Sequence, residues 1–402
     1  MKKIVVIGGG TFSPVRNHLS LCAPAFGTTA RVMSKYLTSM SDSNKYEVIT
    51  HYTKMAFKKS KLVTNEDVEL LIDNLILDEN VKTIVLNVAF CDYNVIDDEA
   101  GFHGERLKTS DGDITLTLTP SKKIIDKIRL TRPDIFLIGF KTTTNASDED
   151  QFLTGLKMMK RSKCNLVLAN DTVTRKNIII TPEESKYVYK SRGKTLKELS
   201  RIILDRHDLT YNRTELVNIK NVIVDKSAPQ TFKEVLKYLV DNNGFIVNNG
   251  NGFTPGHFCY KTSDKSFISS QRKVNHNDVF INGMTNVAVN DNVFTAYGTH
   301  KPSVGARSQW MMFEDNPGYD CIIHTHTPLK EASEVPVASQ KKFQCGSLEC
   351  GMNTVNNLAN FGDIKAVYLD KHGYNLMFKS SSDSQEIIDF INENFELGIK
   401  TT

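Results

Sequence analysis

The first half of this chain alternates segments that favour strands with segments that favour helices, and this alternation limits the folds that it can adopt. The predicted strands are 4–7, 46–50, 83–89, 114–118, 135–139 and 165–169, and the predicted helices are 28–37, 65–77, 121–129, 148–160 and 195–204. Apolar strands that are separated by helices are typical of a parallel sheet covered on both faces. We therefore predict an α/β fold with a Rossmann-like, doubly wound parallel sheet.

Four of these predicted strands lead into loops that are candidates for ligand binding. The loops are 8–11, 90–94, 140–144 and 170–172. Ligands of doubly wound sheets bind at the carboxyl ends of the strands. The glycines at 8–10 suit a phosphate group, because backbone N–H groups without side chains beside them can approach it. We expect the ligand site of the first half at this edge.

The second half contains a strand that carries two histidines. Residues 321–326 are mostly β-branched or apolar, and Pro328 ends the segment. Side chains of a strand alternate between its faces, so His324 and His326 point the same way, with Cα atoms about 6.6 Å apart. His372 lies at the predicted turn of a second strand pair, 366–378. Three histidines and an open position are typical of a catalytic zinc site, whereas the pair alone would equally fit a polar surface.

Length and charge place the chain in a broad class. Its 402 residues exceed one typical domain and indicate two. A hydrophobic content of 40% and a charged content of 24% are ordinary for a globular protein. The formal net charge of +4 is too small to indicate binding to nucleic acid.

The apolar runs and the cysteines of the sequence indicate where in the cell the protein is located. No run approaches 18 apolar residues, and segment 1–8 is too short for a secretory signal, so we expect no membrane association. The seven cysteines are odd in number and scattered, which favours a reduced, cytoplasmic location. Cys345 and Cys350 are the closest pair, and we expect them to be packing residues.

Several motifs of the first half resemble those of the phosphopantothenoylcysteine synthetase family. They are Gly9-Gly10-Thr11 with Pro14-Val15-Arg16, then 89–93, Arg106-Leu107-Lys108 with 114–118, 138–140 and 168–171, in the order and rough spacing of that family. The resemblance covers about residues 1–207 and includes the helix at 195–204. It implies a ligase of coenzyme A biosynthesis that joins a phosphorylated carboxylic acid to cysteine, using CTP or ATP with Mg²⁺.

The same resemblance implies roles for particular residues. Lys108 or Arg106 would neutralise charge that builds on the α-phosphate, and Asp92 would be a third catalytic residue. Arg161 lies near the lysines that contact the triphosphate in the family. The nucleotide-binding residues would be Gly9, Gly10, Thr11, Arg16, Phe140, Lys157, Lys160 and Asn170.

Two features of the first half differ from that family. The asparagine that holds the acyl intermediate is missing from the segment 19–24, which puts the substrate in question more than the nucleotide. A domain that keeps the fold without the chemistry is the alternative. Segment 9–19 also resembles a nucleotidyltransferase signature, although only His18 of its paired histidines is present.

The second half resembles the class II (zinc) aldolases of the fuculose-phosphate and ribulose-phosphate epimerase type. The matching segments are 301–303, 317–320, the His-Thr-His strand, Gly346–Glu349 and 369–373. The resemblance covers about 216–402, after a polar linker at 208–215. It implies a second α/β domain of class II aldolase type, with zinc bound by His324, His326 and His372.

Aldolase chemistry also needs a proton carrier and a phosphate pocket. The family's glutamate falls on Gly305, and Glu314 is expected on the far side of a helix. We therefore expect slow aldolase cleavage, and at most a modest gain of activity in Gly305→Glu if the rest of the pocket is aldolase-like. The phosphate-binding residues would be His257, Ser269, Ser270, Arg272, Lys301 and Ser303.

Two functions follow from these resemblances. The first is a bifunctional enzyme, a probable ligase fused to a zinc lyase, that acts on phosphorylated small molecules and a nucleoside triphosphate and forms a homo-oligomer. The second is a binding or scaffold protein that has lost the activity of one or both domains. Retention of three metal ligands favours the enzyme.

Overall fold

The computed structural model describes residues 1–96, 106–211, 214–219, 228–247, 252–277, 283–291 and 293–399. The chain forms two compact units. The first consists of 1–182 and 186–207, and the second of 183–185 and 208–402.

Part of the predicted linker lies in a strand. Residues 214 and 215 belong to strand β12 (Thr214–Asn218), which pairs with β16 (Val293–Gly298). No helix in the described ranges is long and apolar enough to cross a membrane.

The first unit contains a seven-stranded sheet with five parallel strands. Its order is β11-β10-β9-β8-β5-β1-β4. The parallel strands are β1 (Lys2–Gly10), β4 (Tyr46–Tyr52), β5 (Val81–Ala89), β8 (Phe136–Thr143) and β9 (Leu166–Asp171). β10 (Asn177–Ile180) pairs antiparallel with β9 and with β11 (Lys186–Val188). The predicted parallel sheet is confirmed.

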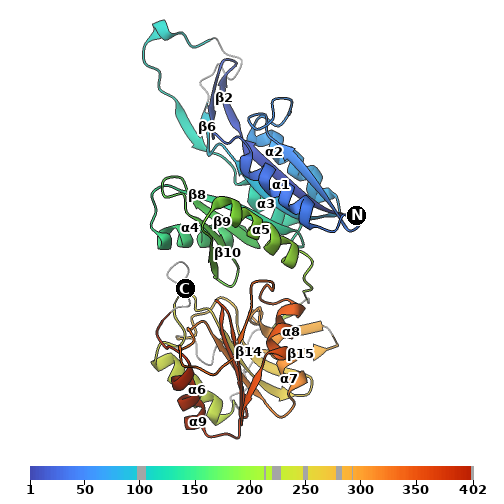
Figure 1. Ribbon diagram of the computed structural model, residues 1–402, viewed down its shortest axis with the longest axis vertical. Coiled ribbons are helices and arrows are strands. Elements are labelled where there is room, and N and C mark those ends of the chain that lie inside the picture. Colours follow the sequence, from blue (N-terminus) through green and yellow to red (C-terminus); the bar gives the residue numbers. More distant parts are fainter. Residues whose placement is uncertain are drawn as a thin grey trace. The chain divides into compact units, whose positions relative to one another are not determined.

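Helices cover both faces of this sheet (Figure 1). They are α1 (Thr28–Met40), α2 (Asn65–Leu77), α3 (Ile124–Thr131), α4 (Asp148–Ser162) and α5 (Arg192–Arg206). Side chains of a strand alternate, so Ile4 and Val6 of β1 pack with α1 and α5, whereas Val5 and Ile7 pack with α2, α3 and α4. This arrangement confirms the doubly wound fold.

Two ribbons leave the sheet where β1 and β5 end. β2 (Phe12–Arg16) pairs with β3 (Leu19–Cys22), and β6 (Tyr93–Ile96) pairs with β7 (Thr117–Pro120). Figure 1 shows β2 and β6 extending away from the sheet. We call these two ribbons and the segment 106–116 the arm. The prediction of 114–118 as a strand of the main sheet is wrong, since 117 and 118 belong to β7 and 114–116 to no strand.

The second unit contains a ten-stranded, mostly antiparallel sheet in the order β12-β16-β15-β14-β13-β17-β21-β20-β18, with β19 also paired to β20. The remaining strands are β13 (His257–Ser263), β14 (Ser266–Ser270), β15 (Met284–Asn290), β17 (Cys321–Thr325), β18 (Val337–Ala338), β19 (Ala359–Phe361), β20 (Ile364–Leu369) and β21 (Gly373–Phe378).

Helices pack on both faces of this second sheet. They are α6 (Gln230–Asp241), α7 (Ala306–Asp315), α8 (Leu348–Asn356) and α9 (Ser384–Asn394). Buried residues of α6 and α9 pack with Ile323 of β17, whereas those of α7 pack with its neighbour Ile322. The predicted α/β class is confirmed for both units.

Candidate functional site

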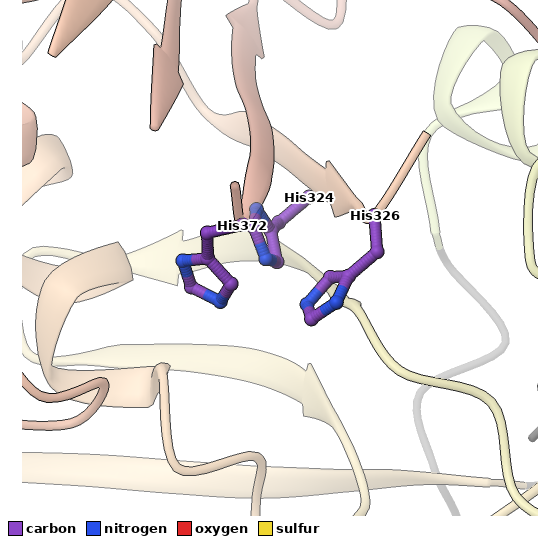
Figure 2. Close-up of side chains that lie close together, drawn as sticks. All are labelled: His324, His326 and His372. Carbon is purple, nitrogen blue, oxygen red and sulfur yellow. The ribbon is translucent and has the colours of Figure 1, made fainter. Parts of the chain in front are cut away.

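Three histidines gather at the end of a central strand of the second unit. His324 belongs to β17, between β13 and β21, His326 directly follows this strand, and His372 lies in the turn between β20 and β21. Their ligand nitrogens all lie within 4.8 Å of one another. Figure 2 shows the three rings around one common space. The structure therefore brings together the three predicted metal ligands.

His324 is held in the form that a metal requires. Its Nδ1 lies 2.7 Å from the carbonyl oxygen of Tyr374, to which an Nδ1–H donates. The Nε2 atom is then left with its lone pair, and it is buried without a hydrogen-bond partner among the described residues. Burial lowers the pKa of His324 well below its usual value, with a contribution from His257. A neutral, oriented imidazole with an unsatisfied acceptor fits a divalent ion.

Glycine is required where the turn brings His372 to this place. Gly373 has a φ of 140°, and a Cβ added there would lie 2.0 Å from the carbonyl oxygen of Thr325. The backbone of the turn thus passes closer to β17 than any residue with a side chain allows. This contact explains why a glycine follows His372.

His257 lies beside the three histidines. It is the register partner of His324 across β13 and β17, and the two ring centroids are 4.6 Å apart. The side chain is 5% exposed, and its Nε2 atom has no hydrogen-bond partner in the described part of the chain. Burial lowers the pKa of His257 to about 3, and the charges of His372 and His276 add to the effect. The prediction of His257 as a phosphate ligand does not fit this enclosed position next to the metal ligands.

The ring of His257 also occupies the space above Gly305. A Cβ added to Gly305 would lie 2.2 Å from Cε1 of His257, closer than real Cβ atoms approach. Any side chain at position 305 therefore collides with this ring. On this ground we do not expect Gly305→Glu alone to place a carboxylate in the proton-carrier position. Glu314 is exposed on α7, as expected.

The other predicted phosphate ligands make internal contacts. The fully buried Ser269 donates its hydroxyl to Gln309 at 3.0 Å, and Ser270 accepts a hydrogen bond from the N–H of Phe258 at 3.2 Å. The prediction of an anion at these two serines is contradicted by their burial. The remaining three contact backbone groups: Arg272 donates to Pro302 (2.6 Å), Lys301 donates to Thr214 (2.7 Å), and Ser303 accepts from Gly305 (3.2 Å).

In the first unit, the glycines have a different role from the one predicted. Gly9 and Gly10 lie in β1, and a Cβ at Gly10 would lie 2.0 Å from the carbonyl oxygen of Ala23. The N–H groups of Gly10 and Thr11 already donate to carbonyl oxygens, at 2.7 and 3.1 Å. The expectation that Gly10 and Thr11 offer free N–H groups to a phosphate is therefore wrong. These residues allow the close packing of strand ends.

Thr11 and Arg16 are likewise part of the framework. The hydroxyl of Thr11 donates to Asn65 (2.6 Å) and accepts from the N–H of Cys91 (2.9 Å), which joins the ends of β1 and β5 to α2. Arg16 is 5% exposed and donates to the carbonyl oxygen of Val15. These contacts support the start of the arm.

A cavity of about 650 Å³ lies at the carboxyl ends of β5 and β8, beside α3 and α4; we call it the β5–β8 cavity. Of the predicted residues, it is lined by Asp92, Phe140, Lys157 and Arg161. Lys122, Lys123 and Lys141 also line it and were not predicted, although Lys141 directly follows Phe140 in a motif. Lys123 pairs with Asp92 at 2.8 Å. The cavity therefore combines an apolar wall with five basic groups.

The remaining predicted residues of the first unit lie elsewhere. Arg106 and Lys108 are exposed in the arm and do not line the β5–β8 cavity. Lys160 points to the carbonyl oxygen of Pro182, at 3.4 Å. Asn170 lines a different cavity, at the end of β9.

Comparison with known proteins bears on the first half of the chain. The family model of the DNA/pantothenate metabolism flavoprotein C-terminal domain matches residues 50–205. The Coenzyme A biosynthesis bifunctional protein CoaBC of Thermococcus kodakarensis is 26% identical over 148 residues, which are 34% of this chain. The match spans 37% of the length of that relative.

Two solved structures that resemble different parts of this chain are a DNA/pantothenate metabolism flavoprotein and an aldolase. The DNA/pantothenate metabolism flavoprotein from Streptococcus pneumoniae is 19% identical, over 50% of this chain and 98% of that chain, with a TM-score of 0.43. An L-fuculose 1-phosphate aldolase is 15% identical, over 41% of this chain and 84% of that chain, with a TM-score of 0.32. The family match confirms part of the predicted resemblance: residues 50–205 are similar to the C-terminal domain of DNA/pantothenate metabolism flavoproteins.

Proposed function

We propose that this chain is a bifunctional enzyme acting on phosphorylated small molecules. Its first unit would carry out nucleotide-dependent ligation of the phosphopantothenate–cysteine type, and its second unit metal-dependent, aldolase-like lyase chemistry. The observation that carries this proposal is the convergence of His324, His326 and His372 with an oriented, unsatisfied Nε2 on His324. A scaffold protein would need no such arrangement.

The residues of the second unit define what a bound metal would do. A zinc ion held by the three histidines would act as a Lewis acid on a substrate oxygen. The carbonyl group of Tyr374 orients His324, and such outer contacts set the tautomer of a ligand. With Gly305 and His257 in place of a glutamate, ordinary aldolase cleavage should be very slow, since a positioned base contributes about 10²–10⁴-fold in rate.

The β5–β8 cavity is the proposed site for CTP or ATP with Mg²⁺ in the first unit. Its basic groups on α4 and β8 would face the triphosphate, and the ring of the half-buried Phe140 would offer an apolar surface to the base. Lys123 is already paired with Asp92, so Lys141, Lys157 and Arg161 are the groups most available to phosphate oxygens.

Replacement of Lys157 by alanine is expected to weaken nucleotide binding by about tenfold, the loss of roughly one charge-assisted contact. Lys160→Ala is a matched control, because Lys160 lies on the same helix outside the cavity. Calorimetric titration of the full-length protein with MgCTP and MgATP measures both effects. Absence of binding at millimolar nucleotide, or equal weakening in both variants, would exclude this site.

The arm is the proposed surface of homo-oligomer formation. Two-stranded ribbons are marginally stable by themselves, and the arm exposes Ile96, Ile114, Leu116 and Leu118 at 36–53% of their surface. Clustered exposed apolar side chains mark association surfaces. A second copy of the same arm would cover them.

Charge introduced on the arm should dissociate this oligomer. Leu118→Lys with Ile114→Lys is expected to give the mass of a single chain in light scattering after size exclusion. Leu130→Lys is the control, because Leu130 is 81% exposed on α3, away from the arm. A wild-type mass of one chain, or an unchanged oligomer in the double variant, would rule out the arm as the interface.

A further inference from the structure

A second cavity of the first unit has no role in the function proposed above. It measures about 630 Å³ and is lined by the turn between β9 and β10 and by the segment that leads into α5. It shares no lining residue with the β5–β8 cavity. β9 ends there, and β10 and α5 begin there, so it lies at the carboxyl edge of the sheet, where ligands of α/β folds bind. We call it the β9–α5 cavity.

Basic side chains dominate this cavity. Arg175, Lys190 and Arg192 line it, and none of them has an acidic partner within the ranges that the structure describes. Asp171 is the acid among the described lining residues, and its carboxylate is saturated. It accepts hydrogen bonds from the N–H groups of Asn145, Ala146, Val173 and Thr174 and from the hydroxyl of Thr143, at 2.8–3.1 Å. Arg175, Lys190 and Arg192 therefore form no ion pair among the described residues, whereas Lys176, the fourth basic lining residue, is paired with Asp148 at 2.6 Å.

A buried amide holds the side chain of Arg192 and the backbone of Arg175. Asn177 is 6% exposed. Its Nδ2 donates to the carbonyl oxygen of Arg175 at 2.8 Å, and its Oδ1 accepts from Arg192 at 2.5 Å. Arg192 also donates to Thr29 at 2.7 Å. Arg175 has a left-handed backbone, with a φ of 61°, which is uncommon and unfavourable for a residue with a side chain.

Two of these cations, Arg175 and Arg192, repel each other. The pKa of Arg192 is lowered by burial and then by the charge of Arg175. Helix α5 begins at the same place with Arg192 and Lys194 and with no acidic residue in its first turn, which is unfavourable at the positive end of a helix dipole. A bound anion would relieve both the repulsion and the unfavourable helix end.

We propose that the β9–α5 cavity binds the phosphate or diphosphate group of a small molecule, separately from the proposed nucleotide site. Two guanidinium groups and a lysine suit the several oxygens of a phosphate, because guanidinium donates in a planar fork. The held position of Arg192 and the fixed backbone of Arg175 lower the entropy cost of binding. The cavity volume fits a small ligand and not a polymer.

The test uses the full-length protein with pyrophosphate and inorganic phosphate as probes. Arg175→Asn removes one cation and keeps a residue that tolerates the left-handed backbone, and Lys190→Gln removes a second. Each is expected to weaken pyrophosphate binding about tenfold in calorimetric titration. The matched control is Lys197→Gln, an exposed lysine further along α5 that does not line the cavity, and it should bind as wild type.

A further variant separates this site from the nucleotide site. Lys157→Ala should retain pyrophosphate binding that Arg175→Asn weakens. Loss of pyrophosphate binding in Lys157→Ala, with none in Arg175→Asn, would place the anion in the β5–β8 cavity and overturn this assignment. An equal loss of pyrophosphate binding in Lys197→Gln would show nonspecific attraction of the anion and overturn the assignment. Absence of wild-type binding at 10 mM pyrophosphate, roughly the weakest affinity of interest, would also overturn it.

Discussion

The purified full-length protein is expected to carry about one zinc or similar divalent ion per chain, and the variant His324→Ala/His326→Ala to carry almost none. The three imidazoles converge within 4.8 Å, and removing two leaves a single nitrogen, which cannot hold an ion against dialysis. Loss of a hydrogen bond that orients a metal ligand already lowers metal affinity about 10–100-fold. Loss of two of the ligands themselves should lower metal affinity by more than this. Elemental analysis after dialysis measures the metal content.

The control for this metal prediction is His300→Ala, since His300 is an exposed histidine of the same unit. Its metal content should equal that of the wild type. Removal of the metal by a chelator should also lower the stability of the wild type, by about 2.7 kcal/mol if the free ion was at 100 times its dissociation constant. The double variant should show no such response. Equal metal in the wild type and the double variant would refute the site.

The parts of the fold that the sequence predicts well are those set by local patterns. Helix α2 was predicted with its observed bounds, because Thr64 and Asp67 form a capping box at its start. The parallel strands β1, β5, β8 and β9 contain short apolar segments buried on both faces, and such segments are recognisable without any knowledge of their partners. The pair His324 and His326, at the end of β17 and directly after it, could be predicted for the same reason, since alternation along an extended segment places both on one face.

The features that were missed depend on contacts between distant segments. The alternating pattern of residues 114–118 indicates an extended segment and cannot say whether a strand joins the main sheet or pairs with β6. The role of Gly10 depends on Ala23 and Ala25, which approach it from beyond β3. The basic groups of the β5–β8 cavity come from β8, from α4 and from the two residues that precede α3, so only the folded sheet brings them together.

The pair Gly305 and His257 is the clearest case of such a contact. Sequence comparison with the aldolase motifs treats the two positions as separate changes, one in the proton carrier and one in the phosphate pocket. The structure shows one shared volume, because the ring of His257 fills the space that a side chain at 305 requires. The two residues are therefore expected to depend on each other.

Substitution of Gly305 by alanine is expected to destabilise the protein by about 1–3 kcal/mol, the usual cost of overpacking a filled interior. The added Cβ would lie 2.2, 2.7 and 2.9 Å from Cε1, Nδ1 and Nε2 of His257. That ring cannot move away easily, since it is 5% exposed and lies against His324. Urea unfolding followed by circular dichroism measures the loss. Gly318→Ala is the control, because a Cβ there meets no atom within 4 Å.

The same substitution should cost much less once the ring is gone. In a His257→Ala background, Gly305→Ala is expected to be nearly neutral, which gives a coupling energy of about 1–3 kcal/mol between the two sites. Additive effects of the two substitutions on stability would contradict the shared volume.

A glutamate at position 305 tests the same contact through activity. Gly305→Glu alone should be destabilised and inactive on fuculose- or ribulose-type phosphates, whereas His257→Asn/Gly305→Glu has room for the carboxylate. With zinc content unchanged, aldolase cleavage should rise only in that double variant, because only there can the new carboxylate reach the metal-bound substrate. Cleavage in Gly305→Glu alone would show that His257 moves aside freely and does not control access to this position.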